Sequence, residues 1–265
     1  MLKTVSRALQ LLNVVGARPE GMSLSELARE LTTNKQDAFR LVRTLAAFQF
    51  VNSDPAARKV RLGPGFLRLA ELARPHLDLR QVAMPALLDL RDKTSETACL
   101  HVMSRDHRVC IVQVESRDEL RCVANIGEAL PLTTGAPGRI FLAYMAQSER
   151  ARLLKSVKRL TVETIVDRKR LNRTISLARQ NGYTVARNET VSGMAAISAP
   201  VFDATGRAVA AVTALGPSQR LSKERLTGFS GYVLEAAAQI SAALGHNGDP
   251  SPTVSALDGG GRHSK

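Results

Sequence analysis

The sequence predicts an α+β protein with two domains, a winged helix-turn-helix followed by a larger domain built on an antiparallel sheet. Three helical patterns and a short hairpin fill roughly the first 62 residues, as in a winged helix. From Glu96 onward, apolar residues alternate as in a half-buried antiparallel sheet. We expect the winged helix at 1–63, a linker helix at 64–78, the second domain at 79–246 and a disordered tail at 247–265.

The first two helices are predicted from helical spacing and from a capping motif. Ser23 and Glu26 form an S-x-x-E capping box at the start of the second helix, and Met22 and Leu27 occupy its hydrophobic-staple positions. The apolar residues at helical spacing are Val5, Ala8, Leu9, Leu12 and Val15 in the first helix and Leu24, Leu27, Ala28 and Leu31 in the second. The segment 32–34 ends the second helix.

A third helix is expected to run to about Ala47, with Thr33 or Asn34 as its N-cap. Its predicted apolar face contains Ala38, Leu41, Val42, Leu45 and Phe48. The segments FVNS and KVRL then read as short strands on either side of the turn segment DPAAR. Helix, helix, turn, helix and hairpin in this order are typical of a winged helix-turn-helix.

The second domain is expected to follow a boundary at Pro64 and Gly65 and a helical stretch with a break near Pro75. Six segments alternate like strands: ETACLHVMS, HRVCIVQVES, LRCVANIG, GYTVAR, GMAAISAPVFD and AVAAVTALG. Helical spacing returns in GAPGRIFLAYM, in RKRLNRTISLARQN and in one closing helix, SKERLTGFSGYVLEAAAQISAAL, with Ser222 as its cap.

Hydrogen-bonding side chains gather on the face of the third helix opposite its apolar residues. At about 100° per residue, Gln36, Arg40 and Arg43 fall together, and Lys35 and Phe39 flank them. In the major groove Gln pairs with adenine, Arg pairs with guanine and an apolar ring contacts a thymine methyl. The pattern therefore indicates a recognition helix. It also fits an ordinary solvated face, on which Gln36 would only help to cap the helix.

Phosphate contacts are expected on both sides of this face. Thr33, Asn34 and the N-terminus of the third helix suit a phosphate group. The hairpin tip carries three cations, which we call the wing cations and which suit the backbone or the minor groove: Arg58, Lys59 and Arg61. We predict binding of double-stranded DNA at a pseudo-palindromic operator by a homodimer or a dimer of dimers.

The composition favours a polyanionic partner. The 265 residues carry a net charge of +13, of which +6 belongs to residues 1–80 and +7 to residues 81–265. No apolar run approaches the roughly 20 residues of a membrane helix, and no signal peptide is recognised, so we expect a cytoplasmic protein without a membrane partner. The run Arg168, Lys169, Arg170 and Arg173 is interpreted as a solvated face.

The three cysteines show no paired spacing, which argues against a zinc site or a disulfide framework. They are Cys99, Cys110 and Cys122, and we interpret them as small apolar side chains buried in strands. No cofactor, metal or catalytic residue is predicted. The sequence contains no G-x-S-x-G, no P-loop and no H-E-x-x-H motif.

The order of these segments resembles the IclR family of bacterial transcriptional regulators. The resemblance spans residues 2 to about 245 and is carried by TVSRALQLLNVV, GMSLSELARELTTNKQDAFRLVRTLAAFQFV, LPLTTGAPGRIFLAY and NGYTVARNETVSGMAAISAPVFDATGRAVAAV. It implies a winged helix-turn-helix, a linker helix and a GAF-like effector-binding domain in a dimer or tetramer. The family often begins its recognition helix with Pro-Lys-Ser-Thr, whereas this chain has NKQD at 34–37. The operator therefore cannot be transferred from relatives.

The resemblance also implies a small-molecule site around LPLTTGAPGRIFLAY. Open backbone N–H groups at Gly135 and Ala136 favour a carboxylate, and Pro137 fits the first turn of a helix. The predicted effector residues are Ile126, Gly127, Thr133, Thr134, Gly135, Ala136, Glu189, Met194, Ala196 and Ser198. Ala186 and Ala196 stand where relatives place an acid and a Cys against a keto acid, so we expect an organic acid of another kind. An ordinary loop-to-helix joint would give the same pattern.

Two other classes stay open from the sequence. A ligand-independent nucleoid or RNA-binding protein would explain the charge but not the large second domain. A metabolite-converting enzyme with an appended winged helix would explain that domain but lacks any catalytic motif. We therefore expect a DNA-binding regulator without enzymatic activity, modulated by a small organic molecule.

Overall fold

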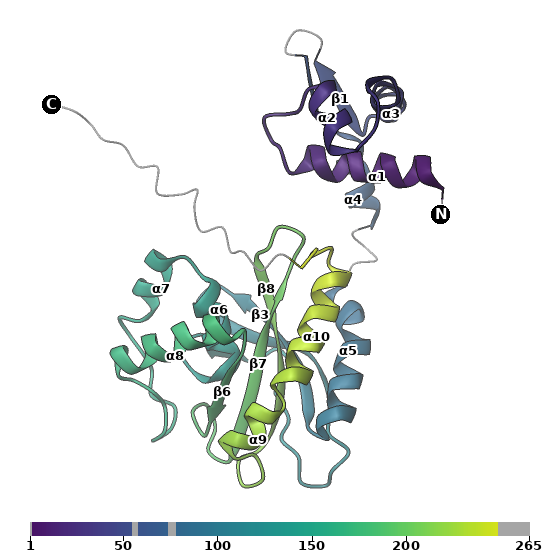
Figure 1. Ribbon diagram of the computed structural model, residues 1–265. Helices are drawn as coiled ribbons and strands as arrows, with labels where there is room; N and C mark the ends of the chain where they lie inside the picture. Colours follow the sequence, from purple (N-terminus) through teal and green to yellow (C-terminus); the bar gives the residue numbers. More distant parts are fainter. Residues whose placement is uncertain (1, 55–57, 74–77, 249–265) are drawn as a thin grey trace, which may run out of the picture. The chain divides into compact units, whose positions relative to one another are not determined.

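The computed structural model describes residues 2–54, 58–73 and 78–248 and divides the chain into two compact units, Met1–Asp78 and Leu79–Lys265 (Figure 1). The predicted break near Pro75 lies outside the described residues, as does the predicted tail at 247–265 apart from its first two residues. Among the described residues, no helix is long and apolar enough to cross a membrane.

The N-terminal unit is a winged helix-turn-helix, as predicted. Its elements are α1 (Lys3–Gly16), α2 (Leu24–Glu30), α3 (Lys35–Ala47), β1 (Val51–Asp54), β2 (Lys59–Leu62) and α4 (Gly65–Ala73). The strands β1 and β2 form an antiparallel hairpin. At the start of α2, the Ser23 N–H donates to Glu26 Oε2 at 2.7 Å and the Glu26 N–H donates to Ser23 Oγ at 3.3 Å. The capping box is therefore confirmed.

Two details of the predicted apolar faces are wrong. In α1 the fully buried residue is Leu11, whereas Val5 and Leu9 are 54% and 58% exposed. Val5 and Leu9 fit the helical spacing, but their side of α1 has no neighbour within this unit's core. Phe48 is 67% exposed because it caps the C-terminus of α3, where the backbone leaves the helical path. Phe50 packs against the core in its place.

The C-terminal unit is built on one six-stranded antiparallel sheet in the order β5-β4-β3-β8-β7-β6. The strands are β3 (Thr97–Ser104), β4 (His107–Val114), β5 (Ala129–Pro131), β6 (Thr184–Arg187), β7 (Met194–Phe202) and β8 (Ala208–Pro217). The helices are α5 (Leu79–Thr94), α6 (Gly135–Tyr144), α7 (Gln147–Leu153), α8 (Arg168–Asn181), α9 (Lys223–Gly228) and α10 (Ser230–Ala243). This architecture confirms the predicted α+β class.

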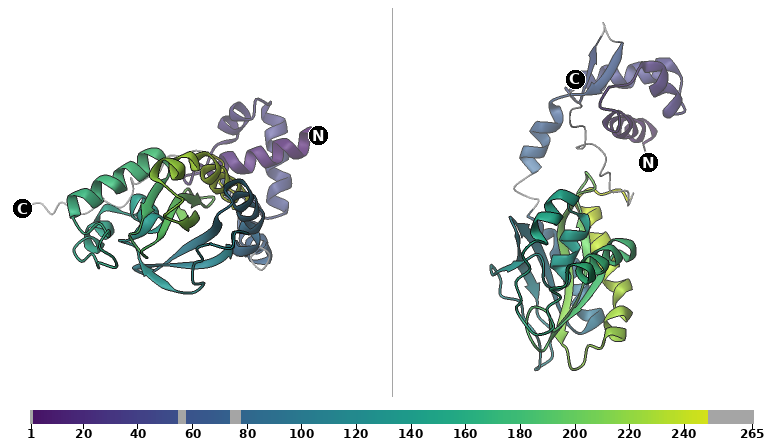
Figure 2. Two further views of the ribbon diagram at one scale, coloured as in Figure 1. Left: turned by 90° about the horizontal axis from the view of Figure 1, so that it is seen from below. Right: turned by 90° about the vertical axis from the view of Figure 1, so that its left-hand side faces the viewer.

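The two faces of the sheet are covered differently (Figure 2). Along β8, Val212 and Ala214 pack into the core formed with α5 and α10, and Ala211 faces the opposite core formed with α6 and α8. This alternation follows from the period of two along a strand. Because α6 and α8 cover only part of their face, polar residues of β3, β4 and β8 on that face can line a cavity.

Four points of the sequence assignment in this unit need correction. The segment LRCVANIG is not a strand: only Ile126 makes an isolated bridge, to Cys110, and Leu120 and Val123 are exposed. The outer edge of β4 is paired instead by β5, which was not predicted. The closing helix is divided at Phe229 into α9 and α10, and Ser222 caps α9 as expected. The short helix α7 was also missed.

Candidate functional site

The polar face of α3 is exposed and continuous. Lys35, Gln36, Arg40 and Arg43 are all exposed, and Phe39 is 52% exposed on the same helix. Ala38, Leu41, Val42 and Leu45 are buried against the other helices of the unit. The five side chains predicted on or beside the recognition face are therefore presented together to solvent.

Asn34 has a defined role at the start of α3. Its Oδ1 accepts the Asp37 N–H at 2.8 Å, and its Nδ2 donates to Asp37 Oδ2 at 3.1 Å. Asn34 is thus the N-cap, and Gln36 takes no part in the cap. A surface hollow beside this helix start is lined by residues that include two unpredicted arginines: Arg7, Ala28, Arg29, Thr32, Thr33, Asn34 and Asp37.

The wing cations lie on β2 and at its start, where the chain leaves the turn of the β1–β2 hairpin. Lys59 pairs in register with Asp54, and Arg61 pairs with Asn52. Arg58 and Arg61 are exposed and Lys59 is half-buried, while residues 55–57 of the turn lie outside the described residues. Arg58 has a positive φ of 52°, as expected at a tight turn.

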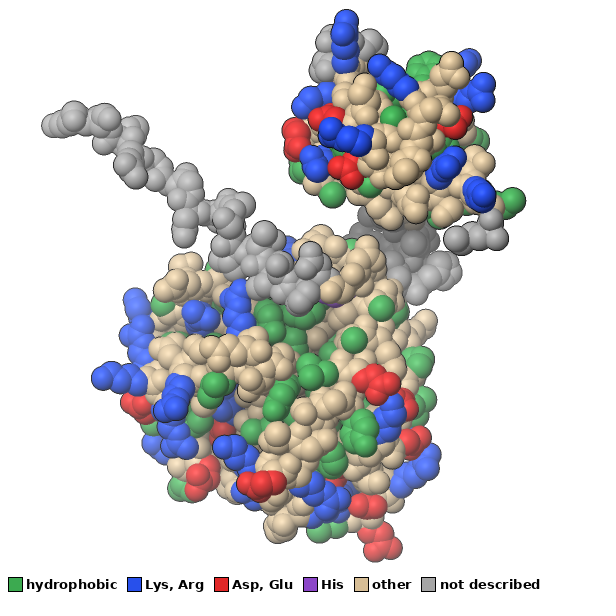
Figure 3. Space-filling view, in the orientation of Figure 1, with side chains coloured by type: hydrophobic (Ala, Val, Ile, Leu, Met, Phe, Trp, Pro, Cys, Tyr) green, Lys and Arg blue, Asp and Glu red, His purple; other side chains and the backbone are tan. Residues whose placement is uncertain are grey.

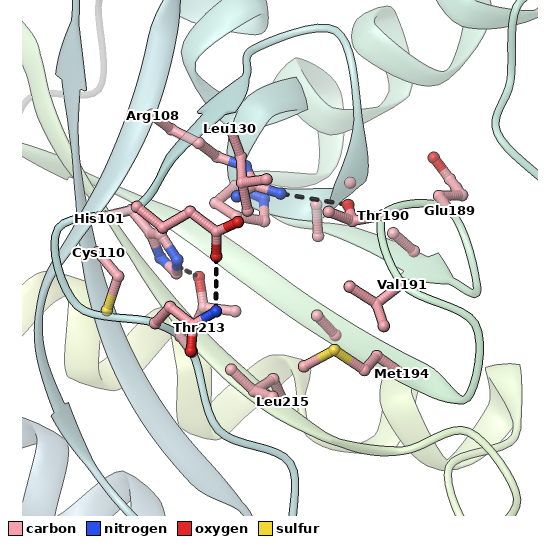
Figure 4. Close-up of a pocket in the computed structure, with 18 of the residues that line it drawn as sticks. His101, Arg108, Cys110, Leu130, Glu189, Thr190, Val191, Met194, Thr213 and Leu215 are labelled. Atoms are coloured by element: carbon pink, nitrogen blue, oxygen red, sulfur yellow. Dashed lines mark hydrogen bonds between the residues drawn. The ribbon is translucent and has the colours of Figure 1, made fainter. Parts of the chain in front are cut away.

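A cavity of about 130 Å³ lies between the C-terminal sheet and the start of α6 (Figure 4). Its wall is apolar, with polar side chains at a few points. The lining residues are His101, Arg108, Cys110, Val123, Ala124, Asn125, Glu128, Leu130, Gly135, Ala136, Pro137, Ala186, Glu189, Thr190, Val191, Met194, Ala195, Ala196, Thr213 and Leu215. A concave, mostly apolar space with few polar groups is typical of a ligand site.

The predicted effector residues divide evenly with respect to this cavity. Five line it: Gly135, Ala136, Glu189, Met194 and Ala196. Five do not: Ile126, Gly127, Thr133, Thr134 and Ser198. Ile126 and Gly127 belong to an exposed loop rather than to a strand, and the Thr134 hydroxyl donates to the Pro131 carbonyl at 3.2 Å.

Arg108, on β4, is the most unusual group in the wall. It is 4% exposed, and its Nη2 donates to Thr190 Oγ1 at 3.2 Å, while its buried Nε has no partner. In the described part of the chain, no carboxylate lies within ion-pair distance of this guanidinium. Burial lowers the pKa of Arg108 to about 10, so the side chain remains a cation at neutral pH.

The N-terminus of α6 opens into the same part of the cavity. Gly135 and Ala136 begin the helix, and the N-cap residue Thr134 provides no side-chain hydrogen bond to it. Gly135 has φ of 72°, and a Cβ there would lie 2.6 Å from Thr190 Oγ1 and 2.9 Å from Arg108 Nη2. Glycine therefore lets the helix start approach the guanidinium. Backbone N–H groups and a cation converge here, as an anion requires.

A neutral polar chain crosses the sheet on the other side of the cavity. The Ser198 and Thr213 hydroxyls lie 2.8 Å apart, and Thr213 Oγ1 lies 3.3 Å from His101 Nδ1. Burial, together with the positive charge of Arg108, lowers the pKa of His101 to about 3, so the imidazole is neutral at pH 7. Ser198 is thus a supporting residue behind the lining rather than part of it.

A second buried arginine is paired. Arg139 Nη2, on α6, lies 2.6 Å from Glu189 Oε1, and the two side chains are only 2% and 9% exposed. Thr164 Oγ1 donates to the Glu189 carbonyl at 2.8 Å and fixes the backbone of the same loop. The carboxylate of Glu189 is therefore already bound by Arg139, although the residue lines the cavity.

The described residues contain no group of three or more His, Cys, Asp or Glu side chains that could hold a metal ion.

Comparison with known protein families assigns the chain to a family. Residues 4–55 match the IclR helix-turn-helix domain, and residues 72–242 match the C-terminal domain of bacterial IclR transcriptional regulators. The chain belongs to the IclR family of bacterial transcriptional regulators.

Named transcriptional regulators agree with this assignment, and a solved structure shares the fold. The transcriptional regulator KipR of Bacillus subtilis is 30% identical over 246 residues, which are 92% of this chain and 98% of KipR. BhcR of Paracoccus denitrificans is 30% identical over 91% of this chain and 86% of BhcR. A solved IclR regulator from Silicibacter sp. TM1040 has a TM-score of 0.83 at 24% identity, covering 94% and 98% of the two chains.

Sequence reasoning missed the polar residues of this IclR-family cavity, above all Arg108, His101 and Thr213. A signal was present in the segment HRVCIVQV, where Arg108 occupies a position in phase with buried Cys110. A charged residue in phase with the buried side of a strand is a candidate ligand contact.

Basic side chains also gather over α7 and α8 (Figure 3). On α8, Arg168, Lys169, Arg170 and Arg173 are exposed.

Proposed function

We propose that this IclR-family transcriptional regulator is controlled by a small organic acid bound in the cavity beside α6. The observation that carries the proposal is the buried cation Arg108, which has no ion-pair partner among the described residues and is attracted only from a longer distance by Glu128 in the same wall. Removing a charge from water costs several kcal/mol, so a buried guanidinium needs a counter-charge. A ligand carboxylate placed between Arg108 and the start of α6 would provide it.

The size and lining of the cavity restrict the ligand. Its volume of about 130 Å³ is close to the roughly 150 Å³ of an apolar cavity that binds benzene. Met194, Leu215 and Val191 give it apolar walls, and neutral His101 and Thr213 offer a hydrogen bond away from Arg108. We infer a monocarboxylate of about the size of benzoate or smaller.

The DNA contacts follow from the exposed face of α3. In this proposal Gln36, Arg40, Arg43 and Phe39 meet base edges in the major groove. Positioning contacts to phosphate and the minor groove come from a separate set that includes the two arginines of the hollow: Thr33, Asn34, Lys35, Arg7, Arg29, Arg58, Lys59 and Arg61. A dimer or dimer of dimers would read a pseudo-palindrome in the cytoplasm, with half-sites about one helical turn apart or a multiple of it.

Control requires the acid to bind two states of the protein unequally. A ligand shifts a conformational equilibrium only by its differential affinity for the states. The segment 64–78 joins the two units along the chain, so a change in the C-terminal unit can alter how two winged helices are spaced in an oligomer. The target genes and the sign of regulation depend on where the operator lies.

The test is a thermal-shift screen in which each acid is paired with its uncharged amide, for example benzoate with benzamide. We expect at least one small carboxylate to raise the melting temperature, and its amide to have no effect at the same concentration. The hit is then added to a genome-wide DNA-binding assay with the purified protein. A screen in which amides stabilise as well as acids do would overturn the carboxylate proposal, and binding of random DNA without preferred sites would overturn the operator proposal.

A further inference from the structure

Two of the three cysteines lie together beside the cavity, and one of them, Cys110, lines it. Cys99 on β3 is opposite Gln113, and Cys110 on β4 is opposite His101, with a register shift between Leu100 and His101. Cys99 and Cys110 therefore occupy diagonal positions on the same face of neighbouring strands. They pack in one buried cluster with Leu215 and have free thiols.

The two thiols pack together and differ in acidity. Cys99 Sγ donates to Gln113 Oε1 at 3.9 Å, and Cys110 Sγ donates to the Val112 carbonyl at 3.5 Å. The neighbouring Cys99 thiol and the charge of Arg108 lower the pKa of Cys110, whereas the neighbouring Cys110 and complete burial raise the pKa of Cys99. Cys110 also lines the cavity, whereas Cys99 lies behind the lining. The more acidic thiol of the pair is thus the one that a small molecule in the cavity can reach.

We propose that Cys110 is a modification site for hydrogen peroxide that enters the cavity, and that Cys99 is the resolving thiol. Thiolates, rather than thiols, are the nucleophiles in this chemistry, and a neighbouring cation favours them. Cys110 has both the cation and a second thiol in contact. Cys122 packs against the same cluster and has Arg220 nearby, but it does not line the cavity, and burial raises its pKa.

Hydrogen peroxide is the only oxidant that this reaction requires. The Cys110 thiolate attacks one peroxide oxygen, the O–O bond breaks, and the departing hydroxide takes a proton to become water. The product is a sulfenic acid on Cys110. The Cys99 sulfur then attacks the Cys110 sulfur, an S–S bond forms, and the S–O bond breaks as hydroxide, which leaves as water with the proton of Cys99. Two thiols lose two electrons, and one peroxide becomes two waters.

The regulatory consequence rests on the proposed function. A carboxylate bound on Arg108 would fill the space in front of Cys110 and neutralise the cation that favours the thiolate. Ligand and peroxide would therefore compete for one cavity, and a saturating ligand should slow oxidation severalfold. The thiol chemistry itself requires no effector.

Peptide mapping of the full-length protein tests the pairing. Trypsin cleaves after Lys93, Arg105, Arg108, Arg117, Arg121 and Arg139, so the three cysteines fall in separate peptides, 94–105, 109–117 and 122–139. The protein is treated with a few equivalents of hydrogen peroxide, alkylated under denaturing conditions and digested without reductant. We expect peptides 94–105 and 109–117 to become linked and peptide 122–139 to remain alkylated. Three fully alkylated cysteines, or a link through Cys122, would overturn the proposal.

Single variants separate the two roles. Cys99→Ser should leave a sulfenic acid on Cys110 that dimedone traps, and Cys110→Ser should abolish the reaction at Cys99. Cys122→Ser is the matched control and should react as the parent does. Equal oxidation of Cys99 in the Cys110→Ser variant would exclude Cys110 as the primary site. A further outcome is that the link forms although a carboxylate found by thermal shift does not slow the oxidation of Cys110. That result would support the thiol assignment and would contradict the proposed position of the effector at Arg108.

Discussion

The arginines of α3 and the arginine of the cavity show two opposite uses of the same side chain. Arg40 and Arg43 are exposed on a helix face, whereas Arg108 is 4% exposed inside the C-terminal unit. An exposed guanidinium retains its hydration and contributes to binding of a polyanion in a salt-dependent way. A buried guanidinium has lost its hydration and must recover that free energy from a partner. The difference indicates that the winged helix meets a large charged surface and the cavity meets one small anion.

Arg139 completes the comparison, because it is as deeply buried as Arg108 but already has its anion in Glu189. Among the described residues, one buried cation thus has an ion-pair partner and the other does not. The following predictions use this contrast, from the largest expected effect to the smallest.

Replacing Arg139 by methionine should cost about 3–5 kcal/mol of unfolding free energy, because it leaves Glu189 as an uncompensated buried charge. Urea unfolding measures the change. Arg108→Met is the matched control, and it should be neutral or stabilising because it removes a buried charge without leaving another. A large loss of stability in Arg108→Met would show that Arg108 has a partner within the folded chain.

Acidification should destabilise the C-terminal unit through His101. Its folded pKa is about 3, well below the ordinary value near 6.5, so the unfolded chain binds a proton that the folded chain does not. Stability should therefore fall as the pH falls from about 6.5 toward 3, by up to about 1.4 kcal/mol per pH unit from this group. His101→Asn should flatten the pH profile, and His107→Asn, at an exposed position, should not. Parallel profiles for the parent and His101→Asn would contradict this assignment.

Arg40→Ala and Arg43→Ala should each weaken operator binding by roughly 1–3 kcal/mol, with specificity relaxed at one base pair, if the side chain makes a bidentate base contact. Arg58→Ala should weaken all sequences alike and reduce the salt slope by about one. Fluorescence anisotropy on operator variants at several salt concentrations separates the two kinds of contact. Base-independent losses in both α3 variants would remove them from the recognition surface.

The smallest effect is expected at the helix cap. Asn34→Ala should reduce the stability of the N-terminal unit by about 1 kcal/mol, because the Asp37 N–H loses its acceptor. Thermal unfolding checks this value. Gln36→Ala serves as the control, and a similar loss in that variant would assign Gln36 to the cap after all.

The N-terminal unit was largely readable from the sequence because its signals are local. The capping box at Ser23, the N-cap at Asn34 and the polar face of α3 each depend on residues a few positions apart. Phe48 was assigned wrongly because helical spacing was extended past the residue at which the helix ends.

The cavity was only half predictable because its wall comes from segments that are distant in sequence. The helix start at Gly135 and Ala136 carried a local glycine signal and was found. Arg108, His101 and Thr213 converge only through the pairing of β3 with β4 and β8, which a single sequence does not specify. The segment LRCVANIG shows the converse, since it has the alternation of a strand but no edge with which to pair along its length.

The most direct test of the account is isothermal titration of one carboxylate that stabilises the protein into the parent and into Arg108→Met. The parent protein and Arg108→Met are also titrated with the corresponding amide. We predict that Arg108→Met binds the carboxylate at least about 30-fold more weakly, since losing a buried charge partner costs roughly 2 kcal/mol or more, and that its affinity for the amide is unchanged. Equal carboxylate affinity in the two proteins would contradict the central claim that Arg108 is the counter-charge of the effector.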